Sequence, residues 1–324
     1  MEKIDILMAT YNGEKYIREQ IDSILSQTYS NFNLIISDDA SSDATVNILK
    51  EYANKDERIK IFKQDKNLGV VSNFEFLLNK VENEFFMFAD QDDIWEENKI
   101  EKSIDKLKEE DADLVYTDLK VVDEDLKKIS DSYWNLKGFK KKVYKYNNFE
   151  SLYLNNYITG CTILCKSKWI KEILPLPKLS EYIIHDYWLA LIVSMNGKIS
   201  YLSDTTIQYR QHEENSIGSK RKSDEIKTFD EIRKLFITVK KEHFEVFINN
   251  NNKFNEKYKK LNEKSLNYFN YLDTKKYINF KDWNLFFKLY KYENFIYMLE
   301  NFIILNIPIL GRILFKVKGT KNGK

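Results

Sequence analysis

Three carboxylates occupy four consecutive positions in the run Asp90-Gln91-Asp92-Asp93, directly after a predicted strand at 84–89. Negative charges this close repel one another, so the cluster is unfavourable unless a cation neutralises it. Carboxylate oxygens suit a hard divalent ion such as Mg²⁺ or Mn²⁺, which often completes its shell with substrate phosphate oxygens. A solvated acidic turn that caps a helix beginning near Trp95 would have the same composition. The position at the end of a strand favours the metal site.

Two further residues have side chains suited to chemistry. His212 is one of only three histidines, and imidazole is a suitable additional ligand for Mn²⁺. A hydrogen-bonded loop histidine is the alternative reading of this position. Asp186 follows His185 at the start of a predicted helix, where a carboxylate is also a good cap.

The elements that would position these residues alternate along the first half of the chain. Apolar, β-branched runs predict strands at 4–9, 34–36, 59–62 and 84–89, and the segments between them carry apolar residues at helical spacing. Such alternation is typical of an α/β fold with a mostly parallel sheet covered by helices. Further strands are expected at 114–116, 161–165 and 199–202, and further helices at 74–81, 147–154 and from 185.

Polar clusters follow three of the predicted strands: Thr10-Tyr11-Asn12, Asp38-Asp39 and the run 90–93. Ligands of open α/β sheets bind beyond the carboxyl ends of the strands, where the loops converge. This coincidence places the expected site at one edge of the sheet.

Composition excludes some classes of function. The 51 basic residues nearly balance the 50 acidic ones, so a global field that would attract nucleic acid is missing. Cys161 and Cys165 lie in an apolar run and are expected to be core thiols rather than a metal or redox site. No secretory signal precedes the first predicted strand, and we expect a cytoplasmic protein.

The last third of the chain has a different pattern. From about 223 onward Gly and Pro become rare and long runs of Lys, Glu, Phe and Tyr predict a helical region. The apolar run 302–315 is interrupted and shorter than the roughly 20 residues that a spanning helix needs. With the basic residues behind it, this end is expected either to contact the inner face of a membrane or to pack against the catalytic domain or a second subunit.

The ordered motifs resemble the family 2 glycosyltransferases of the GT-A fold over roughly residues 1 to 120. The resemblance is carried by 5–12, by Asp38-Asp39-Ala40-Ser41-Ser42-Asp43, by Asn67-Leu68-Gly69 and by Asp90-Gln91-Asp92-Asp93. Downstream, Gly160-Cys161-Thr162, His185-Asp186 and the run 209–218 resemble the rhamnosyltransferase-like branch. The resemblance implies a GT-A catalytic domain at 1–222, with a nucleotide-sugar half at 1–120 and an acceptor half at 121–222, followed by a helical region at 223–324.

The resemblance also implies residues for the donor nucleotide. Thr10 and Tyr11 would line the nucleoside pocket, and Asp39 would accept a hydrogen bond from the pyrimidine imide. Asn67 and Gly69 would face the nucleotide sugar.

The remaining implied roles concern the reaction itself. Asp90 and Asp92 would be the two acids of the Asp-x-Asp motif, with Asp92 the metal ligand and Asp90 nearer the ribose. Asp186 would be the catalytic base, and His212 a further metal ligand.

These roles predict an inverting transfer of a sugar from a dTDP or UDP donor to a glycan or lipid-linked acceptor hydroxyl, with rhamnose as the first candidate and Mn²⁺ or Mg²⁺ as cofactor. The metal would stabilise the departing diphosphate, and a carboxylate on the opposite side would take the acceptor proton.

A metal-dependent nucleotidyltransferase is an alternative, although 8–16 lacks the Gly-rich phosphate loop that such enzymes usually show. A non-catalytic glycan- or nucleotide-binding module is another alternative.

Overall fold

The computed structural model describes residues 2–139, 148–177, 183–212, 228–274, 283–291 and 295–306. The chain divides into two compact units, Met1–Leu176 with Ile184–Asn215 and Pro177–Ile183 with Ser216–Lys324. The predicted boundary between 222 and 223 lies outside the described residues.

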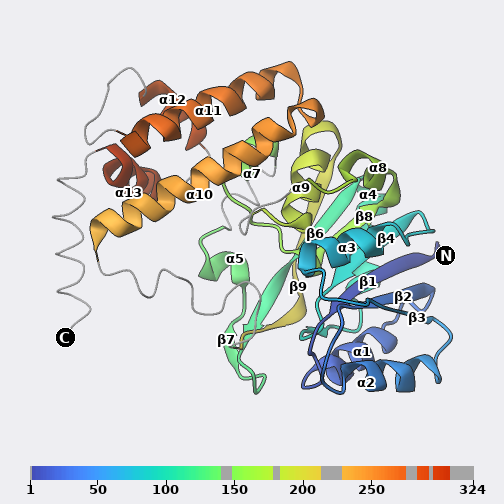
Figure 1. Ribbon diagram of the computed structural model, residues 1–324. Coiled ribbons are helices and arrows are strands. Elements are labelled where there is room, and N and C mark those ends of the chain that lie inside the picture. The colour runs from blue at the N-terminus through green and yellow to red at the C-terminus, as the bar shows by residue number, and fades with distance from the viewer. Residues whose placement is uncertain are drawn as a thin grey trace. The chain divides into compact units, whose positions relative to one another are not determined.

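One sheet organises the first unit, and within the described residues it contains nine strands. They are β1 (Ile4–Thr10), β2 (Phe32–Asp38), β3 (Ile59–Lys63), β4 (Phe85–Ala89), β5 (Ile94–Trp95), β6 (Leu114–Val122), β7 (Lys128–Ser130), β8 (Leu164–Lys166) and β9 (Ile199–Arg210). The order across the sheet is β3-β2-β1-β4-β8-β6-β9-β5, and β7 pairs with β6 (Figure 1).

The pairing of β1 with β2 and β4 decides where the polar clusters meet. All three strands are parallel, with Thr10 opposite Asp38 and Met8 opposite Ala89. β8 is antiparallel to both β4 and β6, and β6 is parallel to β9. The predicted α/β fold with a mostly parallel sheet is confirmed, and the carboxyl ends of β1, β2 and β4 lie at one edge.

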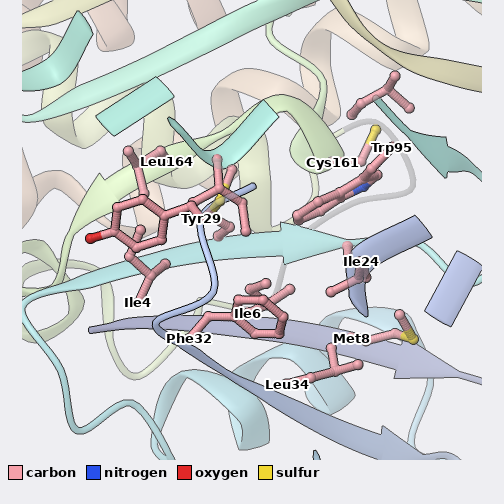
Figure 2. Packing of buried hydrophobic residues seen from close by; sticks show 14 of the residues in the cluster. Ile4, Ile6, Met8, Ile24, Tyr29, Phe32, Leu34, Trp95, Cys161 and Leu164 are labelled. Carbon is pink, nitrogen blue, oxygen red and sulfur yellow. The ribbon is translucent and has the colours of Figure 1, made fainter. Parts of the chain in front are cut away.

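Helices of the first unit cover both faces of the sheet. They are α1 (Ile17–Leu25), α2 (Thr45–Ala53), α3 (Val70–Leu78), α4 (Lys99–Glu109), α5 (Tyr133–Leu136), α7 (Phe149–Leu152), α8 (Ile170–Ile173) and α9 (His185–Asn196), with 3₁₀ turns η1 (Gly160–Thr162) and η2 (Ser167–Trp169). Side chains of α1, α2 and α4 join alternate residues of β1 in one apolar cluster, part of which is shown in Figure 2. Phe74 of α3 packs on Phe88 of β4, with ring centroids 5.2 Å apart.

Three expected elements differ from the structure. No helix begins near Trp95; Ile94 and Trp95 instead form β5, which pairs with Gln208 and Ile207 of β9, and α4 begins at Lys99. Cys161 is not in a strand, because 160–162 form η1 and β8 starts only at Leu164. The last strand does not end at 202 but continues to Arg210, since β6 and β5 both pair with its second half.

The second unit is helical in the part that the structure describes. Its helices are α10 (Phe229–Asn249), α11 (Glu256–Thr274), α12 (Trp283–Leu289) and α13 (Phe295–Asn306), with the 3₁₀ turn η4 (Asn251–Lys253). Thr228 and Glu231 form a capping box at the start of α10, which explains why the helix begins there. Phe244 stacks on Phe269 and joins α10 to α11, with ring centroids 5.6 Å apart. Within the described residues, every helix is too short or too polar to span a bilayer.

Candidate active site

The Asp90–Asp93 loop leaves β4 at the edge where β1 and β2 also end. All residues of β4 are buried, Asp90 and Asp92 are half-buried, and Asp93 is fully buried. Burial, and next the charges of Asp92 and Asp186, together raise the pKa of Asp90 to about 7. Burial also raises the pKa of Asp93 well above its usual range, together with the charges of Asp92 and Asp90. The loop therefore concentrates negative charge that a cation would stabilise.

His212 lies beside Asp92, although the two residues are far apart in the chain. The His212 Nε2 atom is 2.8 Å from Asp92 Oδ2, and the side chains are 7% and 14% exposed. The His212 ring also contacts the Tyr16 ring, with centroids 4.8 Å apart. The two atoms form a hydrogen bond in this structure, and an imidazole nitrogen and a carboxylate oxygen are also ligand types that Mn²⁺ accepts.

A second group of side chains beside Asp90 also carries metal-binding atoms. One ligand atom from each of Asp90, Asp93 and Cys161 lies within 4.8 Å of the others. Asp93 and Cys161 are both fully buried. The structure thus brings together the two predicted metal ligands, and it adds a buried acid and a thiol on the other side of Asp90.

Arg210 holds the Asp90–Asp93 loop in place, a role that its position in the sequence does not indicate. Its Nε donates to the Asp92 carbonyl oxygen and its Nη1 to the Glu124 carbonyl oxygen, both at 2.9 Å. Its Nη2 pairs with Glu19, and the guanidinium lies over the Tyr16 ring. Because His212 follows two positions later, this buried clamp fixes the approach of His212 to Asp92.

Thr10 and Tyr11 lie at the predicted edge of the sheet, but their side chains differ in solvent exposure. Thr10 is 2% exposed and its hydroxyl donates to Asp38 Oδ1 at 3.1 Å. Tyr11 is 47% exposed, and its backbone exchanges hydrogen bonds of 2.9 and 3.0 Å with the Gln91 side-chain amide. Gln91 fills the space that a Cβ on Gly13 would need, so Gly13 permits this contact. Gln91 is a second residue without an expected role.

Asp39 joins the end of β2 to the turn before α3. Its two carboxylate oxygens accept hydrogen bonds from the backbone N–H groups of Leu68 and Gly69, at 2.7 and 2.9 Å. Asn67 Oδ1 also accepts from the Gly69 N–H, at 3.0 Å. Gly69 has a φ of 82°, which favours glycine. The structure therefore brings together Asp39, Asn67 and Gly69, and each Asp39 oxygen keeps a second lone pair for a ligand.

Asp186 is the second residue of α9, which is consistent with the predicted helix start. Its Oδ1 accepts from the Tyr187 N–H at 2.5 Å. Burial raises the pKa of Asp186 to about 6, while backbone hydrogen bonds from Tyr187 and Gly160 oppose this. The negative charge of Asp186 also contributes to the raised pKa of Asp90, so the two carboxylates lie close enough to interact. A carboxyl group with a pKa near neutral is suited to general base catalysis.

The chain matches the family described as Glycosyl transferase family 2 over residues 5–174. It belongs to this family. An uncharacterized glycosyltransferase of Methanocaldococcus jannaschii is 28% identical over 211 residues, covering 64% of this chain and 70% of that protein. The dTDP-rhamnosyl transferase RfbG of Shigella flexneri is 30% identical over 223 residues, covering 65% of this chain and 74% of that protein. Three further relatives match over shorter stretches of 113, 104 and 122 residues, which cover 16%, 42% and 48% of those proteins.

Solved glycosyltransferase structures share the fold. TarS 1-349 of S. aureus, in complex with UDP-GlcNAc, has a TM-score of 0.58 at 18% identity, covering 98% of this chain and 87% of that one. The mannosyltransferase PcManGT of Pyrobaculum calidifontis, in complex with GDP-Man and Mn²⁺, has a TM-score of 0.53 at 14% identity, covering 75% and 63%. The predicted GT-A fold and the predicted enzyme class, a nucleotide-sugar glycosyltransferase of family 2, are confirmed. The alternative function, a metal-dependent nucleotidyltransferase, is not confirmed.

Proposed function

We propose that the enzyme transfers a sugar from a pyrimidine nucleoside diphosphate to a hydroxyl of a bacterial surface polysaccharide or its lipid-linked precursor, with inversion at the anomeric carbon. The observation that carries the proposal is the contact of His212 Nε2 with Asp92 Oδ2 at 2.8 Å, at the edge where the donor loops meet. Similarity to a dTDP-rhamnosyl transferase supports rhamnose as the first sugar to test, and the UDP-GlcNAc complex of TarS supports UDP sugars as the second.

Asp92 and His212 are the residues that would hold Mn²⁺ or Mg²⁺, and the Mn²⁺ complex of the mannosyltransferase supports this choice of metal. When bound, the ion stabilises the negative charge of the leaving nucleoside diphosphate. Asp90, on the same loop, would lie nearer the ribose. Arg210 keeps the loop fixed, so that little reorganisation is needed when the donor binds.

The donor nucleotide would lie over the ends of β1 and β2. The exposed Tyr11 ring offers a flat apolar surface for the base, and Thr10 shapes the pocket behind it. Asp39 would accept a hydrogen bond from the imide N–H, which distinguishes uracil and thymine from cytosine. Asn67 and Gly69 would contact the donor next to it.

Asp186 acts as the base. It takes the proton of the acceptor hydroxyl while the oxygen forms its bond to the anomeric carbon and the bond to the diphosphate oxygen breaks. General base catalysis of this kind contributes roughly 10²- to 10⁴-fold. Because the base and the leaving group lie on opposite faces of the sugar, the transfer inverts the anomeric configuration.

The proposal is tested with full-length protein and a panel of dTDP and UDP sugars. A donor that binds only the folded state raises the melting temperature, so a thermal-shift screen with Mn²⁺ identifies the sugar. Hydrolysis or transfer from that donor should then require Mn²⁺ or Mg²⁺ and stop with EDTA.

Single substitutions test the roles proposed for the metal ligand and the base. Asp92→Asn and Asp186→Asn should each abolish turnover while the circular dichroism spectrum is retained. Asp204→Asn is the matched control, because Asp204 is an exposed acid paired with Lys102 outside the site. Turnover at the wild-type rate in Asp186→Asn would refute its role as the base, and turnover in EDTA would refute the metal requirement.

A further inference from the structure

A cavity of about 410 Å³ lies between β6, the middle of β9 and the segment 131–135 at the start of α5. Ligand pockets usually have volumes of roughly 300–1,000 Å³. Seven of the eight residues that line this cavity are polar, so its walls offer hydrogen bonds rather than an apolar surface. A cavity of this size and polarity suits a small polar ligand.

A bulge in β9 shapes one wall of the cavity. Leu202 and Thr205 pair with consecutive residues of β6, so 203–204 are extra residues on β9. Bulges bend a strand and redirect its side chains, and they are common beside active sites. The bulge brings Ser203 and Thr205 to the wall of the cavity.

Asp118 is the buried anion of the cavity. It is 4% exposed, and its Oδ1 accepts from the backbone N–H groups of Leu119 and Trp134, at 2.8 and 3.1 Å. Its Oδ2 accepts from the Ser132 hydroxyl and keeps a second lone pair for a ligand. These donors are all neutral, and no described lysine or arginine forms an ion pair with Asp118. The cavity therefore holds an uncompensated negative charge.

The two other acids of the cavity are paired with lysines. Asp131 lies 3.0 Å from Lys128 Nζ, and Asp204 lies 2.6 Å from Lys102 Nζ. Because their charges are already balanced at the surface, we assign neither of them a contact with the ligand.

Three neutral side chains of the wall are available to a ligand. Within the described part of the chain, the side chains of Asn135, Ser203 and Thr205 make no hydrogen bond. Hydroxyl groups can donate and accept, and an amide offers both kinds of atom. Together with the Asp118 carboxylate, they match the hydroxyl groups of a sugar.

Strand register gives the position of Asp118 relative to the acid loop. Phe86 of β4 and Leu114 of β6 both pair with Cys165 of β8, to which both strands are antiparallel. Asp90 follows Phe86 by four residues, and Asp118 follows Leu114 by four. Since neighbouring strands are about 4.8 Å apart, the backbones of Asp90 and Asp118 are roughly 10 Å apart across the sheet.

The cavity also lies on the same face of the sheet as the proposed base. Side chains alternate between the faces along a strand, so this register puts Phe88 and Asp118 on one face. The Phe88 ring contacts the ring of His185, with centroids 4.9 Å apart, and His185 directly precedes Asp186. A ligand in the cavity would therefore approach the site from the side of the base, as an acceptor must.

We propose that this cavity is an acceptor subsite that binds a sugar residue without negative charge. Hydroxyl groups of this sugar donate to Asp118 and exchange hydrogen bonds with Asn135 and Ser203. A uronic acid or a phosphate-bearing residue is rejected, because the buried charge of Asp118 repels it. The inference rests on the proposed function, since it specifies the acceptor of the same reaction.

Saturation-transfer NMR on the full-length protein tests the chemistry of the ligand. Methyl glycosides of glucose, galactose and mannose are compared with those of the matching uronic acids, which differ only by the carboxylate at C6. At least one uncharged glycoside should bind with a Kd below about 10 mM, and its uronic acid counterpart at least about tenfold more weakly. Absence of binding by all three uncharged glycosides, or equal binding by the uronic acid, would overturn the inference.

A cavity-filling substitution locates the bound glycoside. Ser203 is exposed, so Ser203→Tyr should fold, and its ring should weaken binding at least about fivefold by occupying the cavity. Ser30→Tyr is the matched control: Ser30 is an exposed serine at the amino end of β2, the end away from the site, and affinity should stay within about twofold. Wild-type affinity in folded Ser203→Tyr contradicts the proposed location.

A second substitution keeps the test decisive if Ser203→Tyr does not fold. Asn135→Leu preserves the side-chain volume at an exposed position but removes the amide, so binding should weaken about 2- to 10-fold through the lost hydrogen bonds. Unchanged affinity in Asn135→Leu would then reject the cavity as the binding site.

Donor turnover separates this inference from the proposed function. Asp92→Asn should bind the glycoside within about twofold of the wild type although it has lost turnover, because the cavity does not include the metal site. A wild-type protein that consumes a pyrimidine diphosphate sugar but binds no uncharged glycoside overturns the inference alone. One that binds the glycoside in the cavity but consumes no such donor overturns the proposed function and leaves a glycan-binding site.

Discussion

Gly160 leaves little room beside the proposed base, and filling that room is a sensitive test of the role of Asp186. A Cβ at Gly160 would lie 3.1 Å from Asp186 Oδ2 and 3.2 Å from Asp186 Cβ, closer than ordinary van der Waals contact. Gly160 is not among the described glycines with positive φ, so alanine fits its backbone. In Gly160→Ala the carboxylate should therefore move by a few tenths of an ångström.

The expected effect on catalysis follows from that displacement. A misplacement of about 1 Å costs roughly 10²-fold in rate, so a few tenths should lower kcat about 3- to 10-fold. The move should also weaken the backbone hydrogen bonds that lower the pKa of Asp186. Activity of the wild type should rise as the pH increases through about 6, where Asp186 loses its proton, and this acid limb should shift to higher pH in the variant.

Steady-state kinetics from pH 5 to pH 8 measure both effects, and urea denaturation measures stability. Gly160→Ala should change the free energy of unfolding by less than about 1 kcal/mol, because alanine restricts the unfolded chain and offsets part of the contact. Gly138→Ala is the control: Gly138 has a φ of 71° and open space around it, so alanine should destabilise by about 1 kcal/mol and leave kcat unchanged. Wild-type kcat and an unshifted acid limb in Gly160→Ala would refute the assignment of Asp186.

Other contacts give three more predictions. Gly13→Ala should displace Gln91 from its paired hydrogen bonds with the backbone and lower stability by about 1–2 kcal/mol in urea titrations; no change would show that the pairing is dispensable. Arg210→Lys should lower the melting temperature and, because His212 is then less well placed, also weaken Mn²⁺ binding in calorimetric titrations; unchanged Mn²⁺ affinity would contradict the clamp. Burial lowers the pKa of His185 to about 3, so the unfolded state takes up a proton below about pH 6.5 and the native state does not. The free energy of unfolding of the wild type, measured relative to that of His185→Phe, should therefore fall by up to about 1.4 kcal/mol per pH unit between about pH 6.5 and 3. Denaturation titrations at several pH values measure this difference, and a difference that does not change with pH would refute the prediction.

Much of the edge where β1, β2 and β4 end could be predicted from the sequence. Parallel strands with short apolar runs must share an edge, so Thr10, Asp39 and Asp90 could be placed together before any coordinates were known. Gly69 likewise has the positive φ that explains a glycine before α3. These features depend on local patterns and on the rules of α/β topology.

The buried side of the site could not be predicted, because it depends on β9. The run Ser203 to Thr206 is polar and resembles a loop, yet it continues β9 to Arg210, where pairing with β5 and β6 compensates for its polarity. Arg210 is one of 51 basic residues, and nothing local distinguishes it. Lys99 similarly resembles any lysine at a helix start, since its burial comes from tertiary packing.

The central claim is that Asp92 and His212 hold a divalent ion at the edge where the donor binds. Anomalous scattering from crystals grown with Mn²⁺ and a nucleoside diphosphate locates that ion most directly. We predict one strong peak within bonding distance of Asp92 Oδ2 and His212 Nε2, adjacent to the diphosphate. A peak between Asp93 and Cys161, or a bound nucleotide with no peak beside His212, would contradict the account.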